Sequence, residues 1–302
     1  MLHDDGGLFR QAVLFASEVL GIESGIVEKD YYVTMFLRAL SAKLPTLVFK
    51  GGTSLSKCCK LIQRFSEDID LNLEGEKRPS EGQRRHLKES IVSTIEEFGF
   101  ALRDPDRVMS RRDYNRYVID FPSAFDFAAL KPVLIVETSV FLRAYPSRKM
   151  EAASLVYDCL KREGRSDLIE RYALEPFALN VQAVERTFLD KLFALGDYCL
   201  AGKVMEHSRH LYDLYKLSAV VAIDEPLKAL FNAVRKERSA HPACLSAQEG
   251  VDLKALLQTI VREDVYRSDY ELVTAKLLFE HVPYENAASA LQKIVDSGLL
   301  DA

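Results

Sequence analysis

The sequence predicts an α+β protein in two parts, a mixed helix and strand part over residues 1–145 and a helical part over residues 146–302. Apolar runs of strand length interrupt the helical spacing up to Leu142, and little strand pattern follows. At 302 residues the chain is long enough for two domains of ordinary size. The change of pattern near Ala144 is therefore the expected domain boundary.

The first part begins with two amphipathic helices. Pro45 ends the second of them, and the apolar run after it predicts a buried strand, a Gly51-Gly52 turn and another helix. A surface helix and two strands set apart by prolines come later. Helices are expected over residues 9–20, 27–40, 54–62 and 83–98, and strands over 46–49, 66–71, 116–121 and 133–141.

The second part has helical spacing in every segment that shows a pattern. A helical domain is therefore expected there. Its helices are predicted over residues 151–162, 167–172, 181–199, 207–221, 225–238, 253–261 and 270–296.

Composition is that of an ordinary globular protein, with 48% hydrophobic and 28% charged residues. The net charge of −5 argues against a surface coated everywhere with nucleic acid and leaves local basic patches open. The N-terminus lacks the features of a signal peptide, and no stretch approaches the roughly 20 apolar residues of a membrane helix. Five cysteines without a C-x-x-C pair fit a reducing compartment, so we expect a cytoplasmic protein with no membrane contact.

Two carboxylates stand two residues apart in the strand-like run Ser66-Glu67-Asp68-Ile69-Asp70-Leu71. Successive side chains of a strand point to opposite faces, so Asp68 and Asp70 point the same way, about 6.5–7 Å apart. Glu67, Ile69 and Leu71 then take the other face, where the two apolar residues can enter the core. A divalent cation can bridge such a pair of acids, which indicates nucleotidyl transfer, although paired acids are also common on solvated strand faces.

The Gly51-Gly52 turn directs the first free N–H groups of the next helix, and the positive end of its dipole, toward whatever lies above the preceding strand. A phosphate fits there. Thr53 and Ser54 add hydroxyls that can either cap the helix or bind a phosphate oxygen. The run does not satisfy the P-loop pattern, so no Walker-type ATPase is indicated.

Glu137 is a lone acid in the otherwise apolar strand expected over residues 133–141. Burying an unpaired carboxylate is costly, so Glu137 either meets a cation or lies at an edge in water. It is a candidate third metal ligand beside Asp68 and Asp70.

Two charged residues of the helical part lie among apolar neighbours. Lys191 follows Phe188 with its charge close to an apolar stripe, and is either a snorkelling surface lysine or a functional cation. Asp213 stands among leucines and tyrosines, and a carboxylate in such surroundings needs a partner.

A basic stretch with interleaved aromatic residues leads into the strand expected over 116–121 and includes its first two residues. It either follows a phosphate backbone or forms a solvated hairpin or loop. Arg143, Arg148 and Lys149 extend it at the domain junction. Its members are Arg103, Arg107, Arg111, Arg112 and Arg116, around Tyr114 and Tyr117.

Several ordered blocks carry a family resemblance. Lys50-Gly51-Gly52-Thr53-Ser54-Leu55-Ser56-Lys57 is followed by Arg64-Phe65-Ser66-Glu67-Asp68-Ile69-Asp70-Leu71. Glu28-Lys29-Asp30-Tyr31 precedes them, and Glu185-Arg186-Thr187-Phe188-Leu189-Asp190-Lys191-Leu192 and Arg209-His210-Leu211-Tyr212-Asp213-Leu214-Tyr215 come later. Over roughly residues 25–220 these blocks resemble the AbiEii/AbiGii toxin family of nucleotidyltransferases, the MenT-like toxins of type IV toxin–antitoxin systems. No motif beyond about residue 220 matches.

The resemblance implies a core like the nucleotidyltransferase domain of DNA polymerase beta, with a mixed β-sheet, and a helical lobe that completes the active-site cleft. It also implies the toxin of a bacterial pair whose antitoxin is a winged-helix regulator. By position, the residues tied to activity in the family are Ser66, Asp68, Lys191 and Asp213. Asp70 matches the second acid of the metal pair, and Glu137 matches the third carboxylate less closely, since many nucleotidyltransferases have Asp there.

Nucleotidyl transfer needs these residue types because negative charge develops on the α-phosphate, the attacking oxygen and the leaving pyrophosphate. Two metals about 3.5–4 Å apart can stabilise both oxygens. Magnesium, or manganese in its place, suits Asp68, Asp70 and Glu137, since magnesium prefers a few carboxylates with water and substrate phosphates.

The remaining residues are assigned to the nucleoside triphosphate (NTP). Lys191 acts on the β- or γ-phosphate as a compact point charge. Asp213 either orders Lys191 or accepts a proton from the incoming hydroxyl. The expected nucleotide-binding residues are Gly51, Gly52, Thr53, Ser54, Ser66 and Lys191.

Several relatives are thought to add nucleotides to tRNA ends and so block translation, which makes tRNA the expected acceptor by analogy. Two alternatives stay open. One is transfer to a protein, as by an AMPylase, or to a small molecule such as an aminoglycoside. The other is a non-catalytic nucleotide-binding module that keeps the fold without turnover.

Overall fold

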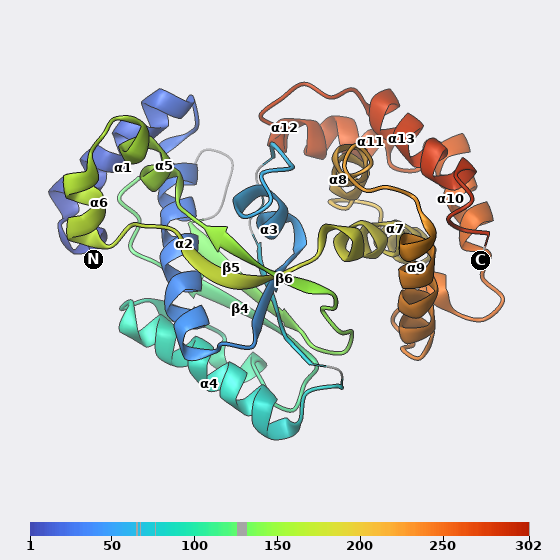
Figure 1. Ribbon diagram of the computed structural model, residues 1–302, viewed down its shortest axis with the longest axis horizontal. Coiled ribbons are helices and arrows are strands. Elements are labelled where there is room, and N and C mark those ends of the chain that lie inside the picture. The colour runs from blue at the N-terminus through green and yellow to red at the C-terminus, as the bar shows by residue number, and fades with distance from the viewer. Residues whose placement is uncertain (65, 67, 76, 126–131, 302) are drawn as a thin grey trace. The chain divides into compact units, whose positions relative to one another are not determined.

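The computed structural model describes residues 1–64, 66, 68–75, 77–125 and 132–301. By residue contacts the chain forms two compact units (Figure 1). Unit 1 contains Met1–Cys58 and Glu67–Val181, and unit 2 contains Cys59–Ser66 and Gln182–Ala302. These units do not coincide with the expected ranges 1–145 and 146–302, because two strands after residue 146 belong to the sheet of unit 1.

Unit 1 contains a seven-stranded sheet. The strands are β1 (Leu47–Lys50), β2 (Asp68–Leu73), β3 (Ala101–Arg103), β4 (Tyr114–Asp120), β5 (Val133–Ser139), β6 (Ser147–Ala152) and β7 (Phe177–Gln182). Their order is β3-β4-β5-β2-β1-β7-β6, with parallel pairs β2–β5 and β1–β7 and antiparallel pairs β1–β2, β3–β4 and β4–β5. The expected mixed sheet is thus confirmed, and the D-x-D strand β2 lies inside it.

The helices of unit 1 are α1 (Gly6–Leu20), α2 (Ser24–Lys43), α3 (Gly51–Lys57), α4 (Glu81–Glu97), α5 (Leu155–Arg162) and α6 (Ser166–Tyr172). Contacts join α2 to α1, α4 and α5, and α6 to α5 (Figure 1). One row of side chains across the sheet, Tyr117, Val136 and Ile69, is fully buried. The core therefore lies on this face of the sheet, whereas the opposite face of β2, β4 and β5 carries charged residues beside apolar ones.

Unit 2 is helical, as expected. Its helices are α7 (Val184–Leu200), α8 (Arg209–Leu217), α9 (Glu225–Ser239), α10 (Leu253–Arg262), α11 (Arg267–Asp269), a π-helical turn (Tyr270–Thr274), α12 (Ala275–Leu277) and α13 (Tyr284–Asp296). Within the unit α8 contacts both α7 and α13, and α10 contacts α7 and α13. Leu211, Leu214 and Leu217 bury the inner face of α8 in these contacts.

In the second part of the chain, two helix predictions are wrong at their first residues and a third is wrong in its interior. The helix expected over 151–162 begins in β6, and that over 181–199 begins in β7. β6 has a charged sequence because it is an edge strand, where charged side chains meet water. β7 carries apolar residues at alternate positions, which is the signal by which it can be recognised. The helix expected over 270–296 is broken before α13, whose N-cap is Pro283.

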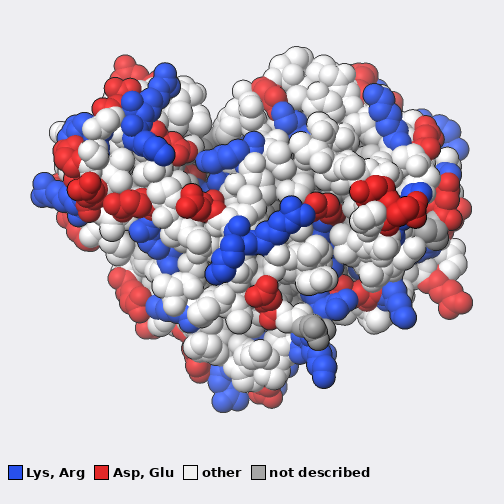
Figure 2. Space-filling view, viewed as in Figure 1, with Lys and Arg blue, Asp and Glu red and all other residues white. Residues whose placement is uncertain are grey.

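No helix of the described residues is long and apolar enough to cross a membrane. The five cysteines are free thiols. On the face shown in Figure 2, acidic and basic side chains are interspersed over each unit, with uncharged areas between them.

Candidate active-site residues in the two units

A row of charged residues crosses the sheet of unit 1 at the D-x-D strand. Asp70 is in register with Glu137 on β5 and with Lys50 on β1, and Glu137 is in register with Arg116 on β4. Neighbours in register point to the same face of a sheet. Four adjacent strands therefore present a positive, two negative and a positive residue in one row, and Asp68 lies one period along β2 on the same face.

The alternation expected for β2 is confirmed. Asp68 and Asp70 are half-buried, whereas Ile69 and Leu71 are fully buried on the opposite face. Glu67, expected on the buried face, and Phe65 lie outside the described residues. Two acids of one segment and a third acid from a distant segment are thus brought onto one sheet face.

Gly51 makes room for Asp70. It opens α3 with a φ of +75°, a conformation that favours glycine. A Cβ at this position would lie 1.9 Å from Oδ2 of Asp70. The helix expected over 54–62 is therefore shifted: it begins with the glycine pair itself and ends at Lys57, after which the chain enters unit 2.

Neither hydroxyl of the glycine turn caps the helix. Thr53 Oγ1 donates to the carbonyl oxygen of Asp68 at 2.5 Å, which ties α3 to the start of β2. Ser54 Oγ donates to the carbonyl oxygen of Gly51 at 2.9 Å and is fully buried. These bonds hold the strand, turn and helix together beside the two acids.

Glu137 meets a cation of the chain itself. Its Oε1 lies 3.3 Å from Arg116 Nε and accepts a hydrogen bond from the Tyr114 hydroxyl at 2.9 Å. Burial raises the pKa of Glu137, and the charges of Asp70 and Asp68 raise it further, while Tyr114 and Arg116 act in the opposite direction. The acids on this face therefore repel one another.

A divalent cation suits this donor set, although the described residues contain no group of three His, Cys, Asp or Glu side chains already placed to hold one. Carboxylates are the ligands that magnesium prefers. Burial first, and then the charges of Asp70 and Asp68, raise the pKa of Glu137, and a bound cation would favour the ionised carboxylates again. The residues that would hold it are Asp68, Asp70 and Glu137.

Unit 2 contains a buried charged triad. Arg64 grips Asp213 with two hydrogen bonds, from Nε to Oδ1 at 2.7 Å and from its terminal nitrogen to Oδ2 at 2.8 Å. Lys191 Nζ lies 3.0 Å from the same Oδ2. All three side chains are buried. Lys191 is therefore no snorkelling surface lysine, and the partners that Asp213 needs are these two cations.

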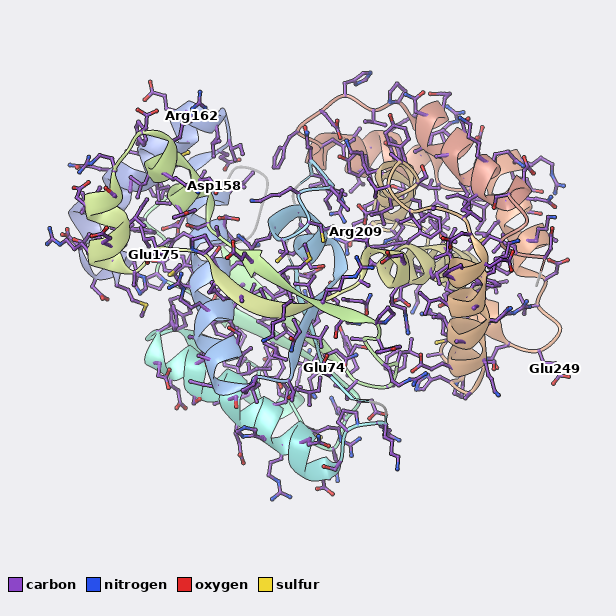
Figure 3. The ribbon with its side chains drawn as sticks, viewed as in Figure 1. Glu74, Asp158, Arg162, Glu175, Arg209 and Glu249 are labelled. Atoms are coloured by element: carbon purple, nitrogen blue, oxygen red, sulfur yellow. The ribbon has the colours of Figure 1, made fainter. Side chains whose placement is uncertain are left out.

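The triad fixes the protonation of Asp213. Burial alone would raise the pKa of Asp213, but the charges of Arg64 and Lys191 outweigh it and hold the pKa well below its usual range. Burial lowers the pKa of Lys191, which Asp213 opposes. Arg209 at the start of α8 (Figure 3) also lowers it. A carboxylate with so low a pKa is a poor proton acceptor, which favours the ordering role for Asp213 over the role of base.

The segment Cys59–Ser66, which carries Arg64 and the half-buried Ser66, is fastened inside unit 2. The backbone N–H of Gln63 donates to the Tyr212 hydroxyl at 2.9 Å, and the N–H of Phe279 donates to the carbonyl of Gln63 at 2.8 Å. Glu280 accepts hydrogen bonds from Tyr212 and Lys216. Residues beyond 220, which showed no motif, thus help to hold Arg64 in place.

The Glu28-Lys29-Asp30-Tyr31 block serves the fold of unit 1. Asp30 binds Lys57 Nζ at 2.5 Å and the backbone N–H of Leu155 at 2.7 Å, so it joins α2 to α3 and to the start of α5. Glu28 accepts hydrogen bonds from Ser123 and from the N–H of Ala124.

Sequence reasoning assigned no role to Arg64 or Tyr114 at these acids. The signal for Arg64 was the need of Asp213 for a partner, but the sequence does not say which of many cations meets it. In the sequence Tyr114 belongs to the same basic stretch as Tyr117, but Tyr117 lies on the other face of β4 and is buried.

Comparisons with known proteins identify the family and the fold of the chain. Residues 35–295 match the family described as the nucleotidyl transferase AbiEii toxin of a type IV toxin–antitoxin system. Among solved structures the chain is similar to MenT4, a nucleotidyltransferase toxin from Mycobacterium tuberculosis H37Rv, with a TM-score of 0.63 and 21% identity over 96% of this chain and 89% of that one. No curated protein matches the sequence.

Proposed function

The chain belongs to the AbiEii family of nucleotidyl transferase toxins of type IV toxin–antitoxin systems, and we propose that it moves a nucleoside monophosphate from an NTP to tRNA. Nucleotidyl transfer is the activity of the family. The acceptor, the metal and the residue roles are our proposal.

The observation that carries the proposal is the set of three acids on one sheet face, Asp68, Asp70 and Glu137, beside a glycine that leaves room for one of them. Such a set destabilises the fold when no cation is bound, because like charges at close range repel one another. We assign magnesium, with manganese as substitute, to these acids. When bound, the cation supplies charge stabilisation for the transferring phosphoryl group.

The chain's own residues bind and orient the substrates. We assign the backbone at Gly51 and Gly52 and the hydroxyl of Ser66 to the triphosphate, and Lys191 to its outer charge. The fully buried Ser54 hydroxyl supports the fold of the turn, and Thr53 joins the turn to β2. Asp213 is a positioning residue that holds Lys191 together with Arg64.

The biological role proposed is arrest of translation by the modified tRNA, with release by an antitoxin. Membership of a toxin–antitoxin family implies an antitoxin partner. We propose a winged-helix protein encoded by a neighbouring reading frame. Its co-expression should relieve growth arrest caused by this chain, and no relief by any neighbouring product would contradict this part of the proposal.

The test is incubation with each labelled NTP, magnesium and total tRNA. Label should enter the RNA fraction, and Asp68→Asn should abolish it. Asp167→Asn, which removes an exposed acid from α6 far along the chain from β2, is the matched control and should label as wild type does.

Three outcomes would contradict the proposal in different ways. Label in protein would indicate an AMPylase-type activity, and label in a small-molecule fraction would indicate an aminoglycoside-type activity. Absence of label with all four NTPs, in magnesium and in manganese, together with growth arrest that survives Asp68→Asn and Lys191→Ala, would indicate a non-catalytic module.

A further inference from the structure

A basic hollow of about 200 Å³ opens beside the charged row of unit 1. Four arginines from β3, β4 and the loop between them line it, together with one acid, Asp104, and the ring of Tyr114. The arginines are Arg103, Arg107, Arg112 and Arg116. The lining therefore has more positive than negative side chains.

Two of the arginines contact carboxylates at hydrogen-bond or ion-pair distance, and the other two are exposed. Arg103 is held by Asp120 through two hydrogen bonds, and Arg116 lies against Glu137. Arg112 donates to the carbonyl of Arg107, and no ion pair of Arg112 is found among the described residues. The Arg107 side chain is 82% exposed, and its acidic neighbour Asp104 is 3.9 Å away in water, where such a pair is weak.

The hollow adjoins the candidate metal ligands. Tyr114 and Arg116, which line it, are the same residues that contact Glu137. Along the next row of the sheet Val118 is in register with Ile135, which is in register with Asp68. Adjacent strands are about 4.8 Å apart, so β4 lies about 10 Å from β2.

In the order of the strands, the glycine turn and the basic hollow lie on opposite sides of the acids on β2. The glycine turn follows β1, on one side of β2, whereas the hollow lies at β4 and β3, on the other. In an in-line transfer the attacking oxygen and the leaving group stand on opposite sides of the phosphorus. With the triphosphate at the glycine turn, the hollow lies on the side from which an acceptor arrives.

We propose that this basic hollow binds phosphodiester groups of the acceptor strand through Arg107 and Arg112, close to the end that receives the nucleotide. The inference rests on the proposed transfer to RNA and adds where the RNA is held. Tyr114, which is 46% exposed, offers a ring face on which a base can stack.

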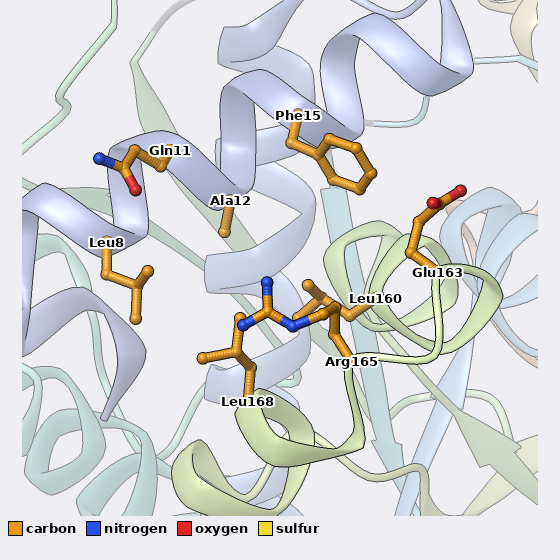
Figure 4. A pocket seen from close by; sticks show the side chains of 8 residues that line it. All are labelled: Leu8, Gln11, Ala12, Phe15, Leu160, Glu163, Arg165 and Leu168. Carbon is orange, nitrogen blue, oxygen red and sulfur yellow. The ribbon is translucent and has the colours of Figure 1, made fainter.

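A second hollow of unit 1 lacks an excess of positive side chains. It measures about 300 Å³ and lies between α1, α5 and α6 (Figure 4). Its lining is mostly apolar, and its charged residues, Glu163 and Arg165, have opposite signs. It has no bias toward an anion, so of these two hollows the basic one is suited to phosphate.

The test measures RNA binding apart from catalysis. Fluorescein-labelled tRNA and a short labelled single-stranded RNA are titrated, over a range of salt, with protein carrying Asp68→Asn and no NTP. Adding Arg107→Gln and Arg112→Gln together should weaken binding about tenfold or more. The salt dependence should also become weaker: the magnitude of the slope of log K against log salt should fall by about 1.4, the value for two phosphates of a single strand. Arg107→Lys with Arg112→Lys should restore most of both.

The matched control is Arg85→Gln with Arg162→Gln, which removes two exposed arginines of unit 1 outside the hollow (Arg162 is labelled in Figure 3). An equal loss in this control, or an unchanged slope in the hollow variant, overturns the inference. Competition by polyglutamate as strong as that by RNA overturns it in favour of an acidic protein, and competition by free NTP as strong as that by RNA does so in favour of a nucleotide site.

Failure of the proposed transfer and failure of the proposed RNA-binding surface can be told apart. If wild-type protein labels no RNA but the binding slope changes as expected, the proposed transfer falls and the binding surface stands. If RNA is labelled and the slope of the hollow variant equals that of the wild type, the surface falls and the transfer stands.

Discussion

The carboxylate of Asp70 occupies the space that a side chain at Gly51 would need: a Cβ there would stand 1.9 Å from Oδ2. Residue 51 also has a φ of +75°. The first glycine of the pair is thus required twice, once by the backbone and once by the acid of the next strand.

Gly51→Ala should therefore displace Asp70 and strain the backbone. We expect a loss of activity of about 100-fold, the scale associated with an ångström of misplacement at a reacting centre, and a loss of stability of about 1–2 kcal/mol. Transfer assays and denaturant unfolding check this. The control is Gly82→Ala on α4, where a Cβ meets nothing closer than 3.9 Å and should be tolerated. Wild-type activity in Gly51→Ala would contradict the idea that Asp70 needs the space beside Gly51.

Glu137→Gln should abolish activity and yet raise the melting temperature of the metal-free protein at neutral pH. Burial and the charges of Asp70 and Asp68 raise the pKa of Glu137 in the folded state. Such a group destabilises the fold as pH rises from its unfolded pKa through its folded pKa, and the amide removes that penalty. The gain should vanish near pH 4, where the unfolded chain also begins to hold the proton. Thermal scans at both pH values measure it. A lower melting temperature at neutral pH would show that the Arg116 contact outweighs the repulsion.

Tyr114→Phe should shift the acidic limb of the activity profile to higher pH. The Tyr114 hydroxyl donates to Glu137 and lowers the pKa of that carboxyl, so its loss raises the pKa. Asp68 and Asp70 on β2 act in the raising direction and Arg116 on β4 in the lowering direction, and all three remain. Protons then compete with the cation at higher pH. A profile measured at several magnesium concentrations checks this, and a shift toward lower pH would exclude Tyr114 as a donor to the ionised form.

Asp213→Asn and Lys191→Met should separate stability from activity. Removing the charge of Asp213 leaves Arg64 and Lys191 buried without it, which should cost about 3–5 kcal/mol. In Lys191→Met the two bonds from Arg64 still hold Asp213, so stability should fall by less than half as much while activity is lost. Denaturant unfolding compares the two variants.

The same triad sets the response to acid. The pKa of Asp213 is depressed in the folded state, so its contribution to stability is present above its unfolded pKa of about 3.9 and is lost as pH falls toward the folded value. Asp213→Asn should therefore flatten the fall in stability below about pH 4. A wild-type slope in the variant would show that other carboxylates govern acid unfolding.

Much of the fold was predictable because its signals are local. Helical spacing located α1, α2, α4 and α9 to within a few residues, a short apolar run located β1, and strand-like runs located β2, β4 and β5. β6 was not predicted because an edge strand keeps charged residues on its exposed positions. The start of α7 was misplaced because the apolar residues of β7 run almost directly into the helical spacing of α7.

What the sequence alone determined is the direction of Asp68 and Asp70, since the two-residue period of a strand is local geometry. Only the tertiary structure decided which acid joins Asp68 and Asp70 on the sheet, and which cation meets Asp213 in unit 2. Glu137 meets Asp70 through strand register, and Arg64 meets Asp213 across 149 positions of the chain. Such pairings depend on how distant segments pack, and a burial that leaves each charge satisfied is a property of the whole fold rather than of any run of residues.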